Sequence, residues 1–115
     1  ILELAREIME LSENARERKI KLEEMKGSTF SITNYGHFGG IFATPIINYP
    51  DVAILGIGKI LDKPVVKDNQ IVIRKIVSLS LTFDHRAIDG VYSAKFLSKV
   101  INYLADPALL FIESA

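Results

Sequence analysis

The chain has 115 residues, of which 49% are hydrophobic and 24% are charged, with 14 basic residues balancing 14 acidic ones. This neutral balance, without a basic stripe, argues against nucleic acid or an anionic membrane as a partner, and no stretch reaches the roughly 18 uninterrupted apolar residues of a membrane span. The absence of cysteine excludes a disulfide framework, a thiolate nucleophile and a cysteine-ligated metal.

The first predicted element is an amphipathic helix. Leu4, Ile8, Leu11 and Ala15 recur at helical spacing, and the opposite face is so highly charged that we expect it to be solvated. No N-cap residue precedes this stripe, and the first residue is Ile1 rather than methionine. We therefore expect the chain to be a fragment that is cut inside, or just before, a helix.

A charged connection then leads to a strand predicted over residues 28–35. Its alternation places Phe30 and Ile32 on one face and Thr33 on the other, so Thr33 should point away from the apolar side. Residues 35–40 form a glycine-rich turn without the spacing of a phosphate loop, and we expect unusual backbone angles there. His37 lies in this turn and is assigned no role. Two histidines without a matched carboxylate pair make a weak metal site, so no metal is predicted.

Residues 52–60 form a continuous apolar run, which is typical of a strand buried on both faces. Gly56 and Gly58 within it predict a close backbone approach or a bulge. Two short apolar runs, 65–67 and 71–73, then flank residues 68–70, which we interpret as the turn of a hairpin.

An alternating pattern over Ile76 to Phe83 predicts a strand with one face in a core. A helix should follow from about Val91 to Ala105, with Asp89 as its N-cap, and should end at Asp106 because Pro107 cannot continue it. The apolar tail over residues 108–112 should either fold back onto its own core or cover a neighbouring chain.

The junction between this strand and helix concentrates the chemistry of the chain. His85 follows the strand directly, with Asp84, Arg86 and Asp89 around it. Imidazole is the side chain best suited to take and return a proton near neutral pH. The same residues also fit a simple ion-pair cluster around a turn, and spacing alone favours that interpretation.

Residues 84–90, Asp-His-Arg-Ala-Ile-Asp-Gly, resemble the DHRxxDG signature of the dihydrolipoamide acyltransferases, the core subunits of 2-oxo acid dehydrogenase complexes. Residues 26–36 are similar to that family's GGTFTISNLG-type segment, and residues 44–58 to its PxINxPxxAILGxG stretch. A shorter HxxxDG motif is shared with chloramphenicol acetyltransferase and other coenzyme A-dependent acyltransferases. The three segments match in the right order, and the resemblance covers nearly the whole chain.

The resemblance implies an α+β fold of the chloramphenicol acetyltransferase type, with a mixed β-sheet and packed helices, present here as a partial domain. Residues 1–115 would form the C-terminal half of the acyltransferase catalytic domain, and the lipoyl and peripheral subunit-binding domains would be absent. If so, strands without their partners should leave open edges and exposed apolar faces.

The resemblance also implies the chemistry. Coenzyme A and lipoamide would be the substrates, with the lipoyl group on a separate domain and no metal. His85 would be the base, Thr33 the donor to the oxyanion, and Asp89 a structural support for the turn. The remaining motif residues, to which local support is assigned, are Asp84, Arg86, Gly90 and Asn34. In this family the histidine and the hydroxyl come from neighbouring subunits of a trimer.

The implied partners are two further copies in a homotrimer, which assembles into a larger cubic or dodecahedral core. The 2-oxo acid decarboxylase and dihydrolipoamide dehydrogenase subunits would bind through the absent domains, in the cytoplasm or, in a eukaryote, the mitochondrial matrix. Two alternatives stay open: another HxxxDG acyltransferase that acts on an alcohol or amine, and a structural core protein without catalysis. The sequence leaves open whether the acyl group is acetyl, branched-chain or succinyl.

Overall fold

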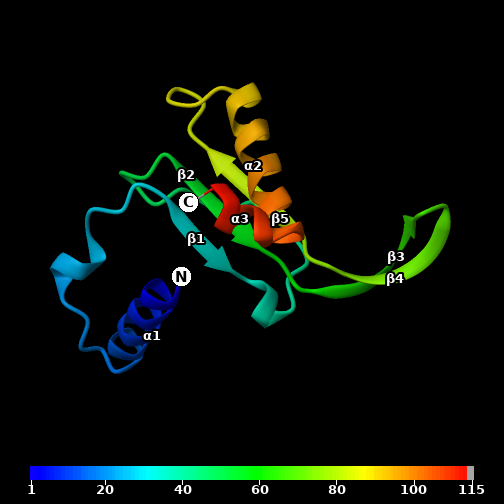
Figure 1. Cartoon of the computed structure of the whole chain (residues 1–115). Helices are drawn as coiled ribbons and strands as arrows, with labels where there is room; N and C mark the ends of the chain where they lie inside the picture. The colour runs from blue at the N-terminus through cyan, green and yellow to red at the C-terminus, as the bar shows by residue number, and fades with distance from the viewer. Residues whose placement is uncertain (114–115) are drawn as a thin grey trace.

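A computed structural model describes residues 1–113, and it shows a small sheet with one helix packed on it, a second helix set apart, and a projecting ribbon (Figure 1). The helices are α1 (Leu2–Arg16), α2 (Gly90–Ala105) and α3 (Ala108–Glu113), with short 3-10 turns η1 (Leu22–Met25) and η2 (Gly36–Phe38). The strands are β1 (Ser31–Asn34), β2 (Ala53–Ile57), β3 (Leu61–Lys67), β4 (Gln70–Ile76) and β5 (Leu79–Phe83). The predicted α+β class is confirmed. No helix within residues 1–113 is long and apolar enough to cross a membrane.

The main sheet has the order β1-β2-β5, with β1 parallel and β5 antiparallel to β2. Ala53 lies opposite Phe83, so these side chains share the face on which α2 packs. Thr33 lies opposite Gly56 and therefore belongs to the other face, where a loop covers the sheet. The strand that carries Thr33 and the strand that leads to His85 thus belong to the same sheet, and β2 lies between them.

The buried apolar core of the described residues consists of Ala53, Ile54 and Leu55, all in β2. The prediction of one strand over residues 52–60 was too long, because the chain leaves the sheet at Gly58. There the Gly58 amide donates to the Ser78 carbonyl at 2.9 Å. The predicted close approach is confirmed, since a Cβ on Gly58 would lie 2.0 Å from the Ile41 carbonyl oxygen.

Strand β1 is shorter than predicted and begins at Ser31 instead of residue 28. Its alternation is as expected, with Thr33 half-buried on the face opposite Ile32. Ile32 is nevertheless 65% exposed, because α2 packs mainly on β5 and makes little contact with β1. Phe30, just before the strand, reaches the helix, with its ring centroid 5.7 Å from that of Phe96.

Strands β3 and β4 form the predicted hairpin, a two-stranded ribbon that extends away from the sheet (Figure 1). Its turn consists of Asp68 and Asn69, whose φ angles of 49° and 61° are typical of a type I′ turn. The predicted turn was one residue too long, because Gln70 already pairs with Lys67. The strand predicted over Ile76 to Phe83 was also too long, since Ile76 belongs to β4.

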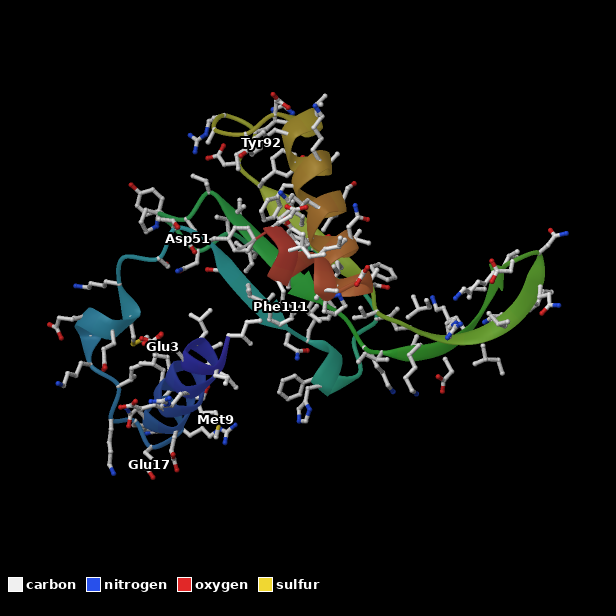
Figure 2. All side chains as sticks on the ribbon, viewed as in Figure 1. Glu3, Met9, Glu17, Asp51, Tyr92 and Phe111 are labelled. Carbon is white, nitrogen blue, oxygen red and sulfur yellow. The ribbon has the colours of Figure 1, made fainter. Side chains whose placement is uncertain are left out.

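The two remaining helices keep much of their apolar surface exposed. Helix α1 forms where the sequence predicted it, without a side-chain N-cap, and none of its residues is buried. Helix α3 folds back onto α2, where the Glu113 carboxylate binds the Lys99 ammonium at 2.9 Å and the Tyr103 hydroxyl. The tail thus lies against α2, but none of its residues is buried, and Phe111 is 63% exposed (Figure 2). Coverage of a neighbouring chain stays a prediction.

Candidate active site

The candidate site is the tight turn that joins β5 to α2. The Asp84 amide donates to the Val52 carbonyl at 2.8 Å, which extends the β2–β5 pairing by one step. The amides of Ala87 and Ile88 then donate back to the Asp84 carbonyl, each at 3.0 Å. These bonds close the turn on itself, so that its side chains project from the end of the sheet.

Asp84 and Arg86 form a clasp across this turn. The Arg86 Nη2 lies 2.6 Å from Asp84 Oδ2, its Nε lies 3.0 Å from Oδ1, and its backbone amide donates to Oδ1 at 2.9 Å. The Arg86 side chain, and then its amide, lower the pKa of Asp84 to about 2, because both stabilise the ionised carboxylate. The predicted local pairing is therefore confirmed.

His85 sits between the two members of this clasp and is exposed. Its ring rests against Phe83, with the ring centroids 5.7 Å apart at an angle of 41°. Asp89 caps α2 as predicted, because its Oδ1 accepts from the Tyr92 amide at 2.7 Å. The backbone and the neighbouring carboxylates therefore hold the turn, while the imidazole faces solvent.

Thr33 and His85 of one chain lie apart. Thr33 pairs with Gly56, whereas Phe83 pairs with Ala53 on the other side of β2. Three residues along a strand and two steps between strands separate the Cα atoms of Thr33 and Phe83 by about 14 Å, and His85 lies two residues further on. Asn34, the other expected residue of β1, accepts from the Gly36 amide at 3.1 Å and fixes the end of the strand.

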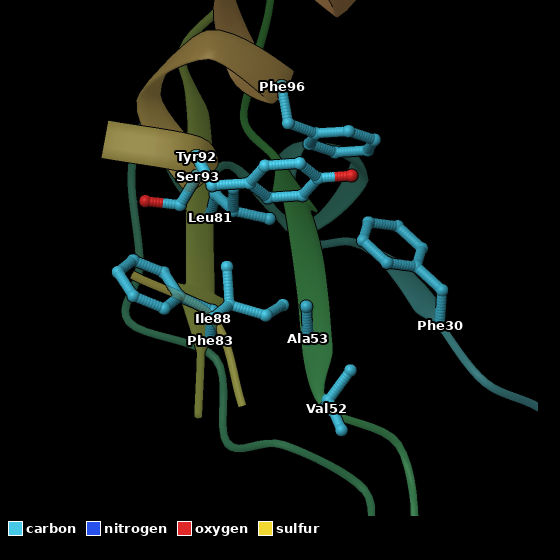
Figure 3. A pocket seen from close by; sticks show the side chains of 9 residues that line it. All are labelled: Phe30, Val52, Ala53, Leu81, Phe83, Ile88, Tyr92, Ser93 and Phe96. Atoms are coloured by element: carbon cyan, nitrogen blue, oxygen red, sulfur yellow. The ribbon is translucent and has the colours of Figure 1, made fainter. Parts of the chain in front are cut away.

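An apolar cavity of about 150 Å³ lies under the turn, between α2 and the sheet (Figure 3). Phe83 lines it and also contacts His85, so the cavity adjoins the imidazole. Its one small polar side chain, Ser93, is buried and donates to the Gly90 carbonyl at 2.9 Å. The remaining lining side chains are Phe30, Val52, Ala53, Leu81, Ile88, Tyr92 and Phe96.

Two polar groups near the site were missed by sequence reasoning. The Tyr35 hydroxyl accepts from the Ala43 amide at 3.0 Å and lies 3.2 Å from Ser80 Oγ. The Asp51 carboxylate is 5% exposed and lies near the beginning of β1 and β2 (Figure 2). The sequence did offer one signal for Asp51. A carboxylate shortly before an apolar strand is expected to be buried, and a buried charge needs hydrogen-bond partners.

The second histidine takes no part in this arrangement. His37 is exposed on η2, where its ring meets that of Phe38 edge-on at 5.7 Å. Within residues 1–113, no three or more histidine or acidic side chains are grouped so that they could hold a metal ion.

Comparison with known proteins shows one family. Residues 1–112 match the family described as 2-oxoacid dehydrogenases acyltransferase (catalytic domain). The chain is 49% identical over 113 residues to the dihydrolipoyllysine-residue acetyltransferase component of the pyruvate dehydrogenase complex of Staphylococcus epidermidis. It is 47% identical over 109 residues to the lipoamide acyltransferase component of the branched-chain alpha-keto acid dehydrogenase complex of Pseudomonas putida. These alignments cover 98% and 95% of this chain but 26% of each relative, so the chain spans about a quarter of their length.

Solved structures show the same fold. The dihydrolipoamide acetyltransferase of Azotobacter vinelandii superposes with a TM-score of 0.90 at 42% identity. The cubic core of the pyruvate dehydrogenase multienzyme complex gives a TM-score of 0.90 at 41% identity. Each comparison covers 96% of this chain and 45% of the other chain. The first of these proteins has been studied for the role of a serine, a histidine and an asparagine in its catalytic mechanism.

Proposed function

Because the chain belongs to the 2-oxoacid dehydrogenases acyltransferase (catalytic domain) family, we propose that it carries the base for moving an acyl group between dihydrolipoamide and coenzyme A. The observation that carries the proposal is the placement of His85, exposed at the end of β5 between the two members of the Asp84–Arg86 clasp. Asp89, four residues later, caps α2. The histidine and asparagine studied in the Azotobacter enzyme are also four residues apart.

The reaction exchanges one thioester for another, so a substrate supplies the nucleophile. A thiol with a pKa near 8.5 is mostly protonated at neutral pH, and the thiolate is the reactive form. His85 removes the thiol proton as the sulfur attacks the acyl carbonyl and forms a tetrahedral intermediate. When the intermediate collapses, the imidazolium returns that proton to the departing sulfur. The transfer therefore needs no metal or protein nucleophile in these steps.

Thr33 is assigned to the oxyanion of this intermediate. It is half-buried in β1, on the face where Gly56 opposes it without a side chain of its own. A preorganised donor at a developing negative oxygen is typically worth about 3 kcal/mol. Asn34 supports this assignment, because its bond to the Gly36 amide fixes the strand directly after Thr33.

The site is completed between two copies of the chain. The Cα separation of about 14 Å between Thr33 and Phe83 is too long for one threonine and one imidazole to reach the same substrate carbonyl. We therefore assign His85 and Thr33 of each site to neighbouring subunits of a homotrimer. Mixing a His85→Ala variant with a Thr33→Ala variant should restore part of the activity in mixed trimers. Failure to recover after confirmed subunit exchange would contradict the shared site.

The chain is proposed to be the C-terminal half of the acyltransferase catalytic domain. The coverage of 45% of the Azotobacter chain supports this assignment, as does the apolar surface that stays exposed on α1 and at Ile32. A trimer that assembles into a cubic or dodecahedral core would cover such surface. The similarity to the solved cubic core favours the same kind of assembly, with the lipoyl and subunit-binding domains elsewhere in the full-length protein.

The decisive experiment measures acyl transfer from acetyl-CoA to dihydrolipoamide by the full-length enzyme. His85→Ala should lower the rate by about two to four decades, because it removes the general base. His37→Ala is the matched control, since it removes the other exposed histidine, and it should keep the rate within about twofold. An unchanged rate for His85→Ala would exclude it as the base. Absence of transfer by the wild type would favour a structural core protein or an alcohol or amine acceptor.

The acyl group is a separate question within the same assay. One relative serves a pyruvate complex and another a branched-chain complex. Comparing acetyl-CoA, isobutyryl-CoA and succinyl-CoA with one enzyme preparation ranks the three substrates directly. We expect acetyl or isobutyryl transfer to exceed succinyl transfer, and a preference for succinyl-CoA would contradict this expectation.

A further inference from the structure

Asp51 is a buried carboxylate that the mechanism above does not use. It is 5% exposed and precedes β2. Ser28 Oγ donates to Oδ1 at 2.8 Å, and Ser31 Oγ donates to Oδ2. Its own amide donates to the Asn48 carbonyl at 2.8 Å. A buried charge is retained only where hydrogen bonds compensate its lost hydration, so these two hydroxyls are specific partners of the carboxylate.

The bond to Ser31 connects Asp51 to β1, the strand that carries Thr33. Ser31 is the first residue of β1, and its side chain lies on the same face as that of Thr33, two residues later. It is also opposite Ile54, close to the beginning of β2. Asp51 therefore fixes the point at which the strand that carries Thr33 enters the sheet.

The residue after Asp51 connects β2 to the turn that carries His85. Val52 is the next residue, and its carbonyl accepts from the Asp84 amide at 2.8 Å. Asp84 in turn holds Arg86, so the turn that carries His85 is anchored at Val52. Asp51 thus lies where the entry to β1 and the His85 turn are both attached, just before the beginning of β2.

We propose that Asp51 is a positioning residue for acyl transfer, which holds the Thr33 strand and the His85 turn of one chain at the start of β2, so that the chain presents Thr33 to one site and His85 to a neighbouring site of the trimer. The inference rests on the proposed function. It adds that the positions of these two segments depend on a buried carboxylate that does not contact the substrate. Misplacement of a reacting group by about 1 Å is enough to lower a rate about a hundredfold. Loss of the carboxylate should therefore affect turnover more than substrate binding.

The test uses the full-length assembled enzyme, with acetyl-CoA and dihydrolipoamide as substrates. Asp51→Ala should lower kcat per folded trimer at least tenfold, with both KM values within about twofold of the wild type. Asp51→Asn should recover most of the rate, because its amide can still pair with both serine hydroxyls. Ser31→Ala removes one partner only and should lower kcat about threefold, which keeps the test informative if Asp51→Ala fails to fold.

Asp62→Asn is the matched control, because it removes a carboxylate that is exposed on the ribbon. It should leave kcat, KM and the melting temperature unchanged. If Asp51→Ala and Ser31→Ala lower only the melting temperature and leave kcat per folded trimer within twofold, Asp51 is a stabilising residue and the inference is wrong. A wild type that transfers no acyl group would instead overturn the proposed function, and this inference with it.

Discussion

The substitution Gly56→Ala tests the packing of the Tyr35 ring against the face of the sheet that carries Thr33. A Cβ at this position would lie 2.7 Å from Cε1 of the Tyr35 ring, against ordinary contacts of about 3.5–4.0 Å. The ring would have to move by about 1 Å, which breaks the contacts of its hydroxyl with Ser80 and Ala43. Overpacking typically costs about 1–3 kcal/mol and each lost hydrogen bond about 1 kcal/mol. We therefore expect the free energy of unfolding to fall by about 3–5 kcal/mol.

The assay is guanidinium unfolding of the acyltransferase domain, followed by circular dichroism, in a double-mutant cycle with Tyr35→Leu. Shortening Tyr35 removes the atom with which the new methyl group collides, so the cost of Gly56→Ala should fall below about 1 kcal/mol in that background. Gly58→Ala is the contrasting variant, because its Cβ would meet the Ile41 carbonyl, which is backbone. Tyr35→Leu should not rescue it. A neutral Gly56→Ala, or an equal cost in both backgrounds, would refute the reasoning.

Three further predictions concern the turn that carries His85. Gly90→Ala should leave the free energy of unfolding unchanged or slightly raised, because a Cβ there meets nothing within 4 Å; a loss above 1 kcal/mol in guanidinium unfolding would contradict this. Asp89→Ala should cost about 1 kcal/mol by removing the N-cap, whereas Asp89→Asn should cost little; equal losses in parallel melts would exclude the capping role. The pKa of Asp84 is lowered to about 2, so the stabilising contribution of its ionised form is present above pH 4 and is lost as the pH falls from about 4 to about 2. Comparing acid unfolding of the wild type with Arg86→Ala, in which this window should vanish, measures that contribution.

Sequence reasoning succeeded where the determinants are local. The Asp89 cap, helix α2 and the positive-φ turn at Asp68 and Asn69 each depend on residues that are neighbours in the chain. The DHRxxDG resemblance also led to His85, which the structure leaves exposed, although its catalytic role stays a prediction.

The failures have a physical cause in tertiary contacts. The alternation of β1 correctly separated Ile32 from Thr33, but it could not show that α2 makes little contact with this strand. The length of β2 was overestimated because an apolar run does not reveal where a chain leaves a sheet. The position of Asp51 before an apolar strand signalled that its charge needs partners, but the two serines lie 20 and 23 residues earlier, and no local pattern identifies them.

The ribbon formed by β3 and β4 has a consequence for how sequence length can vary in this chain. Its two ends, Leu61 and Ile76, are paired with each other, so β2 and β5 are joined through adjacent points. The closure of the sheet therefore depends on those two points and not on the length of chain between them. Residues added or removed in facing pairs near Asp68 would keep the faces of both strands in place. The tip of the ribbon is thus a natural position for an inserted peptide or a spectroscopic label, remote from the turn that carries His85.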